Sequence, residues 1–150
     1  MQRTLILLKP DCIQRRLIGE VIHRFEQKGL RLVGMKLLQA SRDLAEKHYA
    51  VHKGKPFYDS LLKFILAGPT VAMVWEGREA VAVARTLMGP TDGTKAPPAT
   101  LRGDFALSIQ NNLVHGSDSP ENAEAEVKLW FRPEELVAWQ PADAAWVAGK

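Results

Sequence analysis

The apolar residues of this chain come in short runs that alternate with segments of helical periodicity. Runs such as residues 5–8 and 71–75 are far shorter than the roughly 20 residues that a membrane-spanning helix needs. A short apolar run bounded by a proline is typical of a buried strand next to a loop. Strands that alternate with helices in this way predict an α+β fold, in which helices cover an antiparallel sheet.

The order of the predicted elements follows from these patterns and from their start and stop signals. Gly29 ends a helix that begins near Ile18, and Ser41 and Ser119 are suitable N-caps for two later helices. We expect strands over residues 4–8, 33–40, 70–75 and 112–115, and helices over residues 18–28, 44–51, 61–66, 80–88 and 120–131. Residues 89–100 form a long loop rich in Gly, Pro and Thr, and long ordered loops are often functional.

Length and cysteine content indicate one domain in a reducing compartment. A chain of 150 residues can bury a substantial core without disulfides, so we assign residues 1–150 to a single domain. Its only cysteine, Cys12, cannot form an internal disulfide. No charged leader followed by an apolar block is visible after Met1, so we expect a cytoplasmic location.

The charge of the chain is modestly positive, with a formal net charge of +3 and a pI near 9.1. This excess fits an anionic ligand or nucleic acid, and it also occurs in proteins that bind neither. Several basic residues stand at the ends of apolar segments rather than in one run. That placement is how a small anionic ligand would be held.

Two common phosphate-handling motifs are absent from the sequence. There is no G-x-x-x-x-G-K-[ST] loop and no H-R-D or D-F-G set of a protein kinase, since Gly103-Asp104-Phe105 is not D-F-G. Phosphoryl transfer would therefore need another catalytic group. A histidine can serve, because it is a nucleophile that can carry a phosphoryl group covalently.

Among the four histidines, His115 has the setting of a reactive group. It ends a predicted strand beside Gly116, which would let a ligand approach, and a helix N-terminus follows. His23 and His48 fall within predicted helices, where a structural role is expected, and the sequence around His52 indicates nothing. A core histidine is the alternative for His115 on these grounds.

Glu126 lies on the inward arc of the last predicted helix. That arc also carries Ala123, Val127 and Trp130. A buried carboxylate needs a partner, and His115 would be suitable, because the carboxylate would fix the ring tautomer and leave the other nitrogen free to attack. Alternatively, Glu126 sits at the edge of the arc in water.

Phosphate groups are best held by arginine forks and lysine charges, with hydroxyl groups completing the cage. Lys9, at the end of the first strand, is one candidate, and the others are Arg85, Thr91 and Arg102. Each of these could instead be a solvated surface group.

Four separate segments resemble nucleoside diphosphate kinases, and the resemblance extends over nearly the whole chain. Residues 112–119, N-L-V-H-G-S-D-S, resemble the family's signature around its phosphorylated histidine. Residues 4–11 resemble its first strand and K-P-D ending, residues 100–105 its T-I-R-G-D-F stretch, and residues 129–136 read L-W-F-R-P-E-E-L. The four matches follow one another in the family's order.

The resemblance implies a ferredoxin-like α/β sandwich with a four-stranded antiparallel sheet. It also implies an enzyme that moves the terminal phosphoryl group of a nucleoside triphosphate, mainly ATP, to a nucleoside diphosphate. Transfer would be ping-pong, with His115 as the nucleophile that becomes phosphohistidine and Glu126 as its orienting partner.

The same resemblance assigns the nucleotide-binding residues. Those that would hold phosphates and ribose are Lys9, Tyr49, Arg85, Thr91, Arg102 and Asn112, with Lys9 also acting in catalysis. Phe57 and Ile109 would sandwich the base. Mg²⁺ would arrive bound to the nucleotide phosphates, with Asp118 contacting it only through water, so no metal site built from protein ligands is expected.

Three residues depart from the family's usual pattern. Cys12 replaces a glycine after K-P-D, Gly93 stands where many members have proline, and Ala99 replaces the glycine of P-G-T. None of these changes removes a catalytic residue. The two loop changes put the rigidity of the loop in question, because glycine widens and alanine narrows the accessible backbone states.

The tail of the chain carries Trp139 and Trp146, which need a surface to cover them. It resembles the tail of hexameric relatives, so we expect a homohexamer. The alternative to an enzyme is a nucleic-acid-binding or regulatory protein on the same fold, suggested by the basic pI. Because no basic tract is interleaved with aromatics, nucleic acid is at most a secondary partner.

Overall fold

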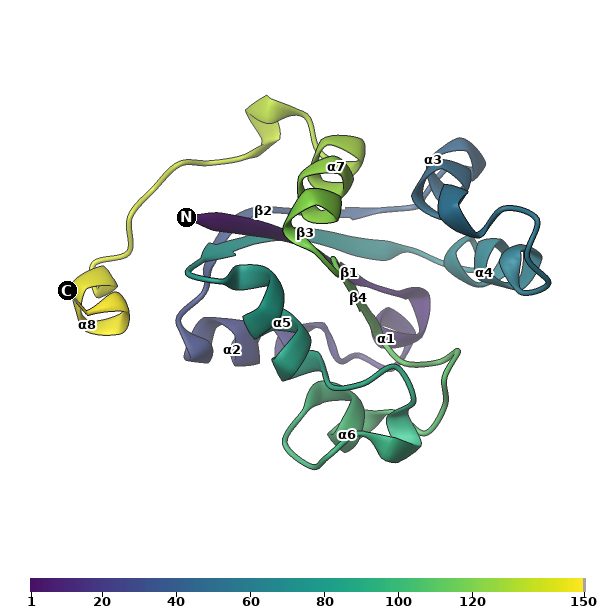
Figure 1. Ribbon diagram of the computed structural model, residues 1–150, viewed down its shortest axis with the longest axis horizontal. Coiled ribbons are helices and arrows are strands. Elements are labelled where there is room, and N and C mark those ends of the chain that lie inside the picture. The colour runs from purple at the N-terminus through teal and green to yellow at the C-terminus, as the bar shows by residue number, and fades with distance from the viewer. Residues whose placement is uncertain (150) are drawn as a thin grey trace.

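One antiparallel sheet of four strands, in the order β2-β3-β1-β4, forms the centre of the chain (Figure 1). The strands are β1 (Gln2–Leu8), β2 (Arg31–Leu38), β3 (Thr70–Gly77) and β4 (Val114–Gly116). These elements come from a computed structural model that describes residues 1–149. β1 lies between β3 and β4, with Leu7 of β1 opposite His115 of β4. The first strand and the last strand are therefore neighbours.

Helices cover both faces of this sheet (Figure 1). On one face are α2 (Ile18–Lys28) and α5 (Ala80–Met88), and on the other are α3 (Arg42–His48) and α7 (Pro120–Trp130). With both faces covered, β1 is buried from Leu5 to Leu8 without alternation. Ile6 and Leu8 belong to the core that α2 and α5 share, whereas Leu5 and Leu7 belong to the core beneath α7.

Shorter elements fill the connections between these layers. They are α1 (Pro10–Gln14), the 3-10 helix η1 (Ala50–His52), α4 (Tyr58–Ile65), the 3-10 helix η2 (Gly93–Lys95), α6 (Leu101–Phe105), the 3-10 helix η3 (Pro133–Glu135) and α8 (Ala144–Ala148). α4 packs against α3 through Ala45, Leu62 and Ile65. No helix within residues 1–149 is long and apolar enough to cross a membrane.

The predicted fold class is confirmed, and the predicted strands and helices are all present with altered ends. Three α-helices of the described residues were not predicted, namely α1, α6 and α8. Pro10 was expected to begin a loop, but it occupies the first turn of α1, where its missing N–H is not needed. α6 follows the long loop and is capped by Thr100, whose Oγ1 accepts a hydrogen bond from Gly103 N (3.0 Å). The helix expected over residues 44–51 was wrong at its end, because α3 stops at His48 and η1 follows.

The three departures from the family pattern occupy different environments. Cys12 is buried, and burial raises the pKa of its thiol to about 12, so the thiol stays protonated. Gly93 is packed so closely that an added Cβ would lie 2.4 Å from the Ala106 carbonyl oxygen. Ala99 has a φ of 76°, in the left-handed region that favours glycine. The loop is therefore tight at Gly93 and strained at Ala99.

Candidate active site

A tight turn leads the chain into β4 and places two of the predicted site residues. Val114 N donates to Asn112 O (2.9 Å), which leaves Leu113 at the centre of the turn with a φ of 75°. This backbone state is costly for a branched side chain, so the surroundings must hold it. Asp11 Oδ2 accepts from Leu113 N (3.0 Å), and Lys9 N donates to Leu113 O (2.9 Å). The K-P-D ending of the first strand thus braces the turn that precedes the nucleophile candidate.

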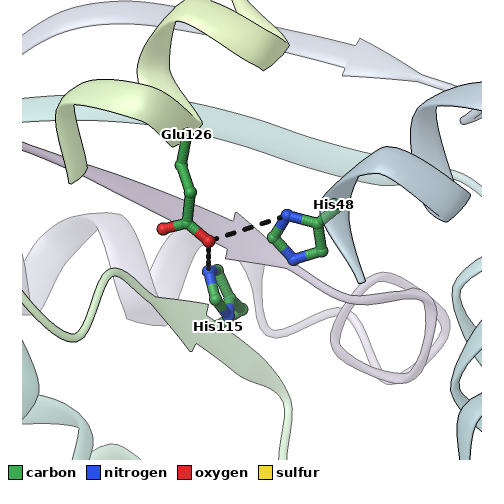
Figure 2. A group of neighbouring side chains, drawn as sticks. All are labelled: His48, His115 and Glu126. Carbon is green, nitrogen blue, oxygen red and sulfur yellow. Dashed lines mark hydrogen bonds and ion pairs between the residues drawn. The ribbon is translucent and has the colours of Figure 1, made fainter. Parts of the chain in front are cut away.

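His115 projects from β4 toward a carboxylate of α7, as Figure 2 shows. Its Nε2 lies 2.9 Å from Glu126 Oε2. The other oxygen, Glu126 Oε1, accepts a hydrogen bond from Ser117 Oγ (2.6 Å). Within residues 1–149, the second ring nitrogen of His115, Nδ1, makes no hydrogen bond. A proton on Nε2, facing the carboxylate, would leave a lone pair on Nδ1.

The electrostatics of Glu126 favour its ionised form. Burial acts to raise the pKa of this carboxyl, but the hydrogen bond from His115, the charge of His115 and the hydrogen bond from Ser117 outweigh it. The pKa of Glu126 therefore lies below its ordinary value. A negative charge is thus held beside His115 at neutral pH.

His48, for which a structural role was expected, lies in the same cluster (Figure 2). Its side chain is only 1% exposed, and its Nδ1 is 3.7 Å from Glu126 Oε2. Trp130 Nε1 donates to the same Nδ1 over 3.2 Å, so this nitrogen carries a lone pair and the ring is neutral. Burial, followed by the charge of His115, lowers the pKa of His48 to about 3. No local sequence pattern marks His48, because its contacts come from segments far along the chain.

One cavity of about 810 Å³ opens over these groups. All ten residues that the sequence analysis selected line it: Lys9, Tyr49, Phe57, Arg85, Thr91, Arg102, Ile109, Asn112, His115 and Glu126. His48 and Asp118 line it as well. The ten predicted residues lie on four elements, α5, α6, β4 and α7, and on five connecting segments of the chain.

Two cations of the cavity are held in place by oxygen atoms of the chain. Lys9 Nζ donates to Asn112 Oδ1 and to Gln110 O, the latter over 3.4 Å. Burial lowers the pKa of Lys9 to about 8, with the charge of Asp11 opposing the shift and that of Arg102 adding to it. Arg85 Nη1 donates to Gly116 O (3.1 Å), at the C-terminal end of β4.

Arg102, which was predicted to bind phosphate, also makes several hydrogen bonds to the backbone. Its guanidinium donates to Asn112 O (3.2 Å), Gly89 O (2.9 Å) and Val114 O (2.6 Å). These bonds use three of its five N–H groups, which leaves two for a ligand. Burial, and then the charge of Arg85, lower the pKa of Arg102 to about 10, so it remains a cation at neutral pH.

The mouth of the cavity is apolar. Phe57 and Ile109, the predicted base clamp, are 45% and 62% exposed. The Phe57 ring has the imidazole of His52 at 5.3 Å and Lys55 Nζ at 5.8 Å from its centre. A flat apolar group could therefore bind at the mouth while an anion reaches the cations below.

The donors of the site fit Mg²⁺ only as part of a nucleotide. In residues 1–149, the one cluster of three or more potential metal ligands is His48, His115 and Glu126. Two of its members are imidazoles, whereas Mg²⁺ prefers oxygen ligands, and the lone pair of His48 Nδ1 already accepts from Trp130. Asp118 lies in the cavity wall and can contact a hydrated ion.

Comparisons with known proteins agree with this arrangement. The family model described as nucleoside diphosphate kinase matches residues 2–136. A nucleoside diphosphate kinase from Thermosynechococcus vestitus is 58% identical over 147 residues, covering 98% of each chain. A relative from Carboxydothermus hydrogenoformans with the same name is 53% identical, over 98% of this chain and 99% of its own.

Solved structures give the same result. A nucleoside diphosphate kinase family protein from Babesia bovis superposes with a TM-score of 0.95 at 45% identity, covering 98% of this chain and 99% of its own. A halophilic nucleoside diphosphate kinase from Halobacterium salinarum, in complex with CDP, superposes with a TM-score of 0.95 at 47% identity, covering 97% of each chain. By its sequence and by its fold, the chain belongs to the nucleoside diphosphate kinase family of phosphotransferases.

Proposed function

We propose that this enzyme transfers the terminal phosphoryl group of a nucleoside triphosphate, mainly ATP, to a nucleoside diphosphate through a phosphohistidine at His115. One observation carries the proposal. One ring nitrogen of His115 contacts Glu126, while the other makes no hydrogen bond to residues 1–149 and lies in a cavity lined with cations. A nucleophile needs both an orienting partner and an open lone pair, and His115 has the two together.

In the first half-reaction, His115 Nδ1 attacks the terminal phosphorus with its lone pair. The N–P bond forms as the bond from phosphorus to the bridging oxygen breaks, and that electron pair leaves on the nucleoside diphosphate. The imidazole becomes more positive, and the carboxylate of Glu126 on Nε2–H compensates the charge. In the second half-reaction, a terminal oxygen of another nucleoside diphosphate attacks the same phosphorus and His115 is released.

The other cavity residues would bind and orient the phosphates. Lys9, Arg85 and Arg102 offer positive charge where the transition state carries negative charge on its oxygens. Tyr49, Thr91 and Asn112 offer hydroxyl and amide groups for phosphate and ribose. Burial, then the charge of Glu126, raise the pKa of Tyr49 to about 12, so its hydroxyl remains a donor.

Mg²⁺ would enter with the nucleotide, held by its phosphates and by water, and it would neutralise phosphate charge. Phe57 and Ile109 would hold the base by its faces, which all bases have, so ribose and deoxyribose substrates with any common base should be accepted. The CDP in the Halobacterium salinarum structure supports a pyrimidine nucleotide as one ligand of this fold.

We also propose a cytoplasmic hexamer of single-domain subunits. Trp139 is 48% exposed and Trp146 is 91% exposed in the single chain, and both belong to the tail that follows η3. A neighbouring subunit would cover these indoles. Light scattering at micromolar concentration tests this, since a monomer or a tetramer would contradict it.

The decisive experiment for the chemistry is intact-mass spectrometry after mixing the protein with Mg·ATP and no acceptor. A gain of one phosphoryl group is expected, acid-labile and alkali-stable, and any nucleoside diphosphate should remove it. His115→Ala should abolish loading, and Glu126→Gln should slow it in a folded protein, because the amide loses the charge that compensates the imidazole. Intersecting initial-rate lines, or loading retained by His115→Ala, would overturn the proposal.

A further inference from the structure

The buried contact between Trp130 and His48 takes no direct part in the phosphoryl transfer proposed for His115. The indole Nε1–H of Trp130, the last residue of α7, donates to His48 Nδ1 at the end of α3 (3.2 Å). The imidazole of His48 stands edge-on to that of His115, with ring centres 4.6 Å apart and an interplanar angle of 82°. A neutral histidine therefore packs directly against the nucleophile.

We propose that Trp130 acts as a tautomer lock on His48, so that the carboxylate of Glu126 is left to His115 alone. Trp130 has a donor and no acceptor, so its hydrogen bond requires a lone pair on His48 Nδ1 and puts the proton of that ring on Nε2. This inference rests on the proposed phosphohistidine chemistry. It makes Trp130 and His48 positioning residues, since they act through Glu126 and His115.

The lock matters because His48 Nδ1 also lies near Glu126 Oε2, the oxygen that contacts His115. The distance from Nδ1 to Oε2 is 3.7 Å, compared with 2.9 Å from His115 Nε2. If His48 carried its proton on Nδ1, a small shift would let it donate to the same oxygen. Two imidazoles would then share one negative charge, and His115 would lose part of its compensation.

Protonation of His48 would have a larger effect in the same direction. The titratable groups that face His48 are Glu126 from α7, His115 from β4 and His52 from η1. The ring of Tyr49, the next residue in the chain, also packs against His48. Glu126 alone among them favours a cationic His48. The bond from Trp130 opposes that cation, because Nδ1 cannot accept from the indole and hold a proton at once.

Trp130→Phe tests the lock, because it keeps an aromatic ring and removes the N–H. The proton of the neutral His48 ring can then move from Nε2 to Nδ1, which lies 3.7 Å from Glu126 Oε2 and can turn toward it. The rate of phosphorylation by Mg·ATP near neutral pH should fall about 3- to 10-fold, the factor of one net hydrogen bond. The acid limb of its pH profile should move to higher pH, since a cationic His48 now gains a partner.

Trp75→Phe is the matched control. Trp75 is also fully buried, and its Nε1 has no hydrogen-bond partner in the described part of the chain. Trp75 of β3 pairs with Thr4 of β1, whereas His115 of β4 pairs with Leu7, three residues further along β1. The same loss of ring volume there should lower stability while leaving the acid limb in place.

Two measurements separate the lock from packing. The tautomers of His48 and His115 can be read from two-bond ¹H–¹⁵N correlation spectra of the full-length protein without nucleotide, assigned with single histidine variants. Wild-type His48 should be the Nε2–H tautomer throughout the neutral range, and in Trp130→Phe it should change tautomer or begin to titrate. In the double variant Trp130→Phe/His48→Phe, the acid limb should return to its wild-type position, because no second imidazole remains beside Glu126.

The inference is overturned if wild-type His48 is protonated on Nδ1 or if Trp130→Phe changes neither the tautomer nor the acid limb. It is also overturned if the shifted limb persists in the double variant. These results are distinct from a failure of the proposed function, which would appear as a wild-type protein that Mg·ATP does not phosphorylate, whatever the tautomer of His48.

Discussion

The hydroxyl group of Ser117 donates to Glu126 Oε1 over 2.6 Å, so the carboxylate is held from both sides, by Ser117 on one oxygen and by His115 on the other. Ser117 is itself fixed, because Leu5 N donates to its Oγ (3.2 Å). A backbone group of the central strand thus sets the orientation of Glu126 through one side chain.

Ser117→Ala should slow phosphorylation of His115 without abolishing it. The carboxylate would lose one of its two anchors, and the rate should fall about 3- to 10-fold, as expected for one hydrogen bond. Leu5 N would lose a buried acceptor, which should lower stability by about 1–3 kcal/mol. Ser119→Ala is the control, because it removes the N-cap of α7 and should lower stability with little change in the loading rate. Equal losses of rate in the two variants would contradict the role of Ser117.

The lowered pKa of Lys9 predicts an alkaline limb in the rate at which the free enzyme is phosphorylated. Burial places this pKa at about 8, so the cation that is proposed to bind the phosphates is lost above that pH. Lys9→Arg should extend activity to higher pH, because arginine stays charged. Initial rates at low nucleotide concentration from neutral to alkaline pH provide the measurement. An unchanged limb in Lys9→Arg would assign it to another group.

The same shift predicts the pH dependence of stability. The folded pKa of Lys9, about 8, is below the unfolded value of 10.5, so between these values the unfolded state binds more protons. The contribution of Lys9 to the free energy of unfolding should therefore rise with pH through this window and be least favourable below about 8. Denaturant unfolding of wild type and Lys9→Met should show a difference that changes in this direction, and a constant difference would contradict it.

Phe57→Ala should weaken the binding of every common nucleoside diphosphate. Removal of one stacking face should reduce binding by about 1–3 kcal/mol for each base. Leu107→Ala removes another exposed apolar side chain, one that does not line the cavity, and should leave binding unchanged. Calorimetric titration with purine and pyrimidine nucleotides is the test, and a loss confined to one base would be inconsistent with stacking.

Ala99→Gly should stabilise the protein. Relief of the left-handed backbone strain at Ala99 should raise the free energy of unfolding by about 1–2 kcal/mol. The greater freedom of glycine in the unfolded chain should lower it by about 0.4–1 kcal/mol. A net gain of about 0.5–1 kcal/mol is expected from these two effects. Ala96→Gly in the same loop should be destabilising, because φ there is −74° and no strain is relieved. Urea unfolding of both variants decides between a gain and a loss at position 99.

Gly93→Ala should destabilise the loop, despite the residue's position where relatives often have proline. Its Cβ would approach the Ala106 carbonyl oxygen to 2.4 Å, and displacement of this backbone should lower stability by about 1–3 kcal/mol. Gly19→Ala is the opposite control. Gly19 lies in α2 with nothing within 4 Å of an added Cβ, so alanine should raise stability by about 0.5–1 kcal/mol. A stable Gly93→Ala protein would show that the backbone near Ala106 can move.

Sequence patterns predicted the parts of the molecule that depend on local order. Helical periodicity placed Glu126 on the inward arc of α7. The short strand predicted near His115 also exists, but it runs from Val114 to Gly116, so His115 lies at its centre rather than at its end. The contact between them was a hypothesis from charge burial, and their atoms lie 2.9 Å apart. Phosphate-binding chemistry suggested four further residues, Lys9, Arg85, Thr91 and Arg102, and the resemblance to a family added Tyr49, Phe57, Ile109 and Asn112.

The role of His48 and the backbone bonds of Arg102 were not predicted, because they depend on contacts between distant segments of the chain. His48 lies at the end of a helix whose own pattern is unremarkable, and its tautomer is determined by Trp130, 82 positions away. Arg102 has the residue type of a phosphate ligand, but its guanidinium donates three of its five N–H groups to backbone carbonyl oxygens. Spacing cannot reveal such contacts, because it describes neighbours within one element.

Because β1 pairs with β4, the site can form only late in the synthesis of the chain. Lys9 and Asp11 leave the ribosome early, yet their partners Asn112 and Leu113 are made about a hundred positions later. Glu126 follows His115 on the next helix. On the proposed mechanism, a nascent chain that lacks α7 also lacks the carboxylate that compensates the imidazole, so His115 should accept phosphate from ATP only slowly until α7 has docked. Rapid phosphorylation of His115 would then report that β4 has paired with β1 and that α7 has docked.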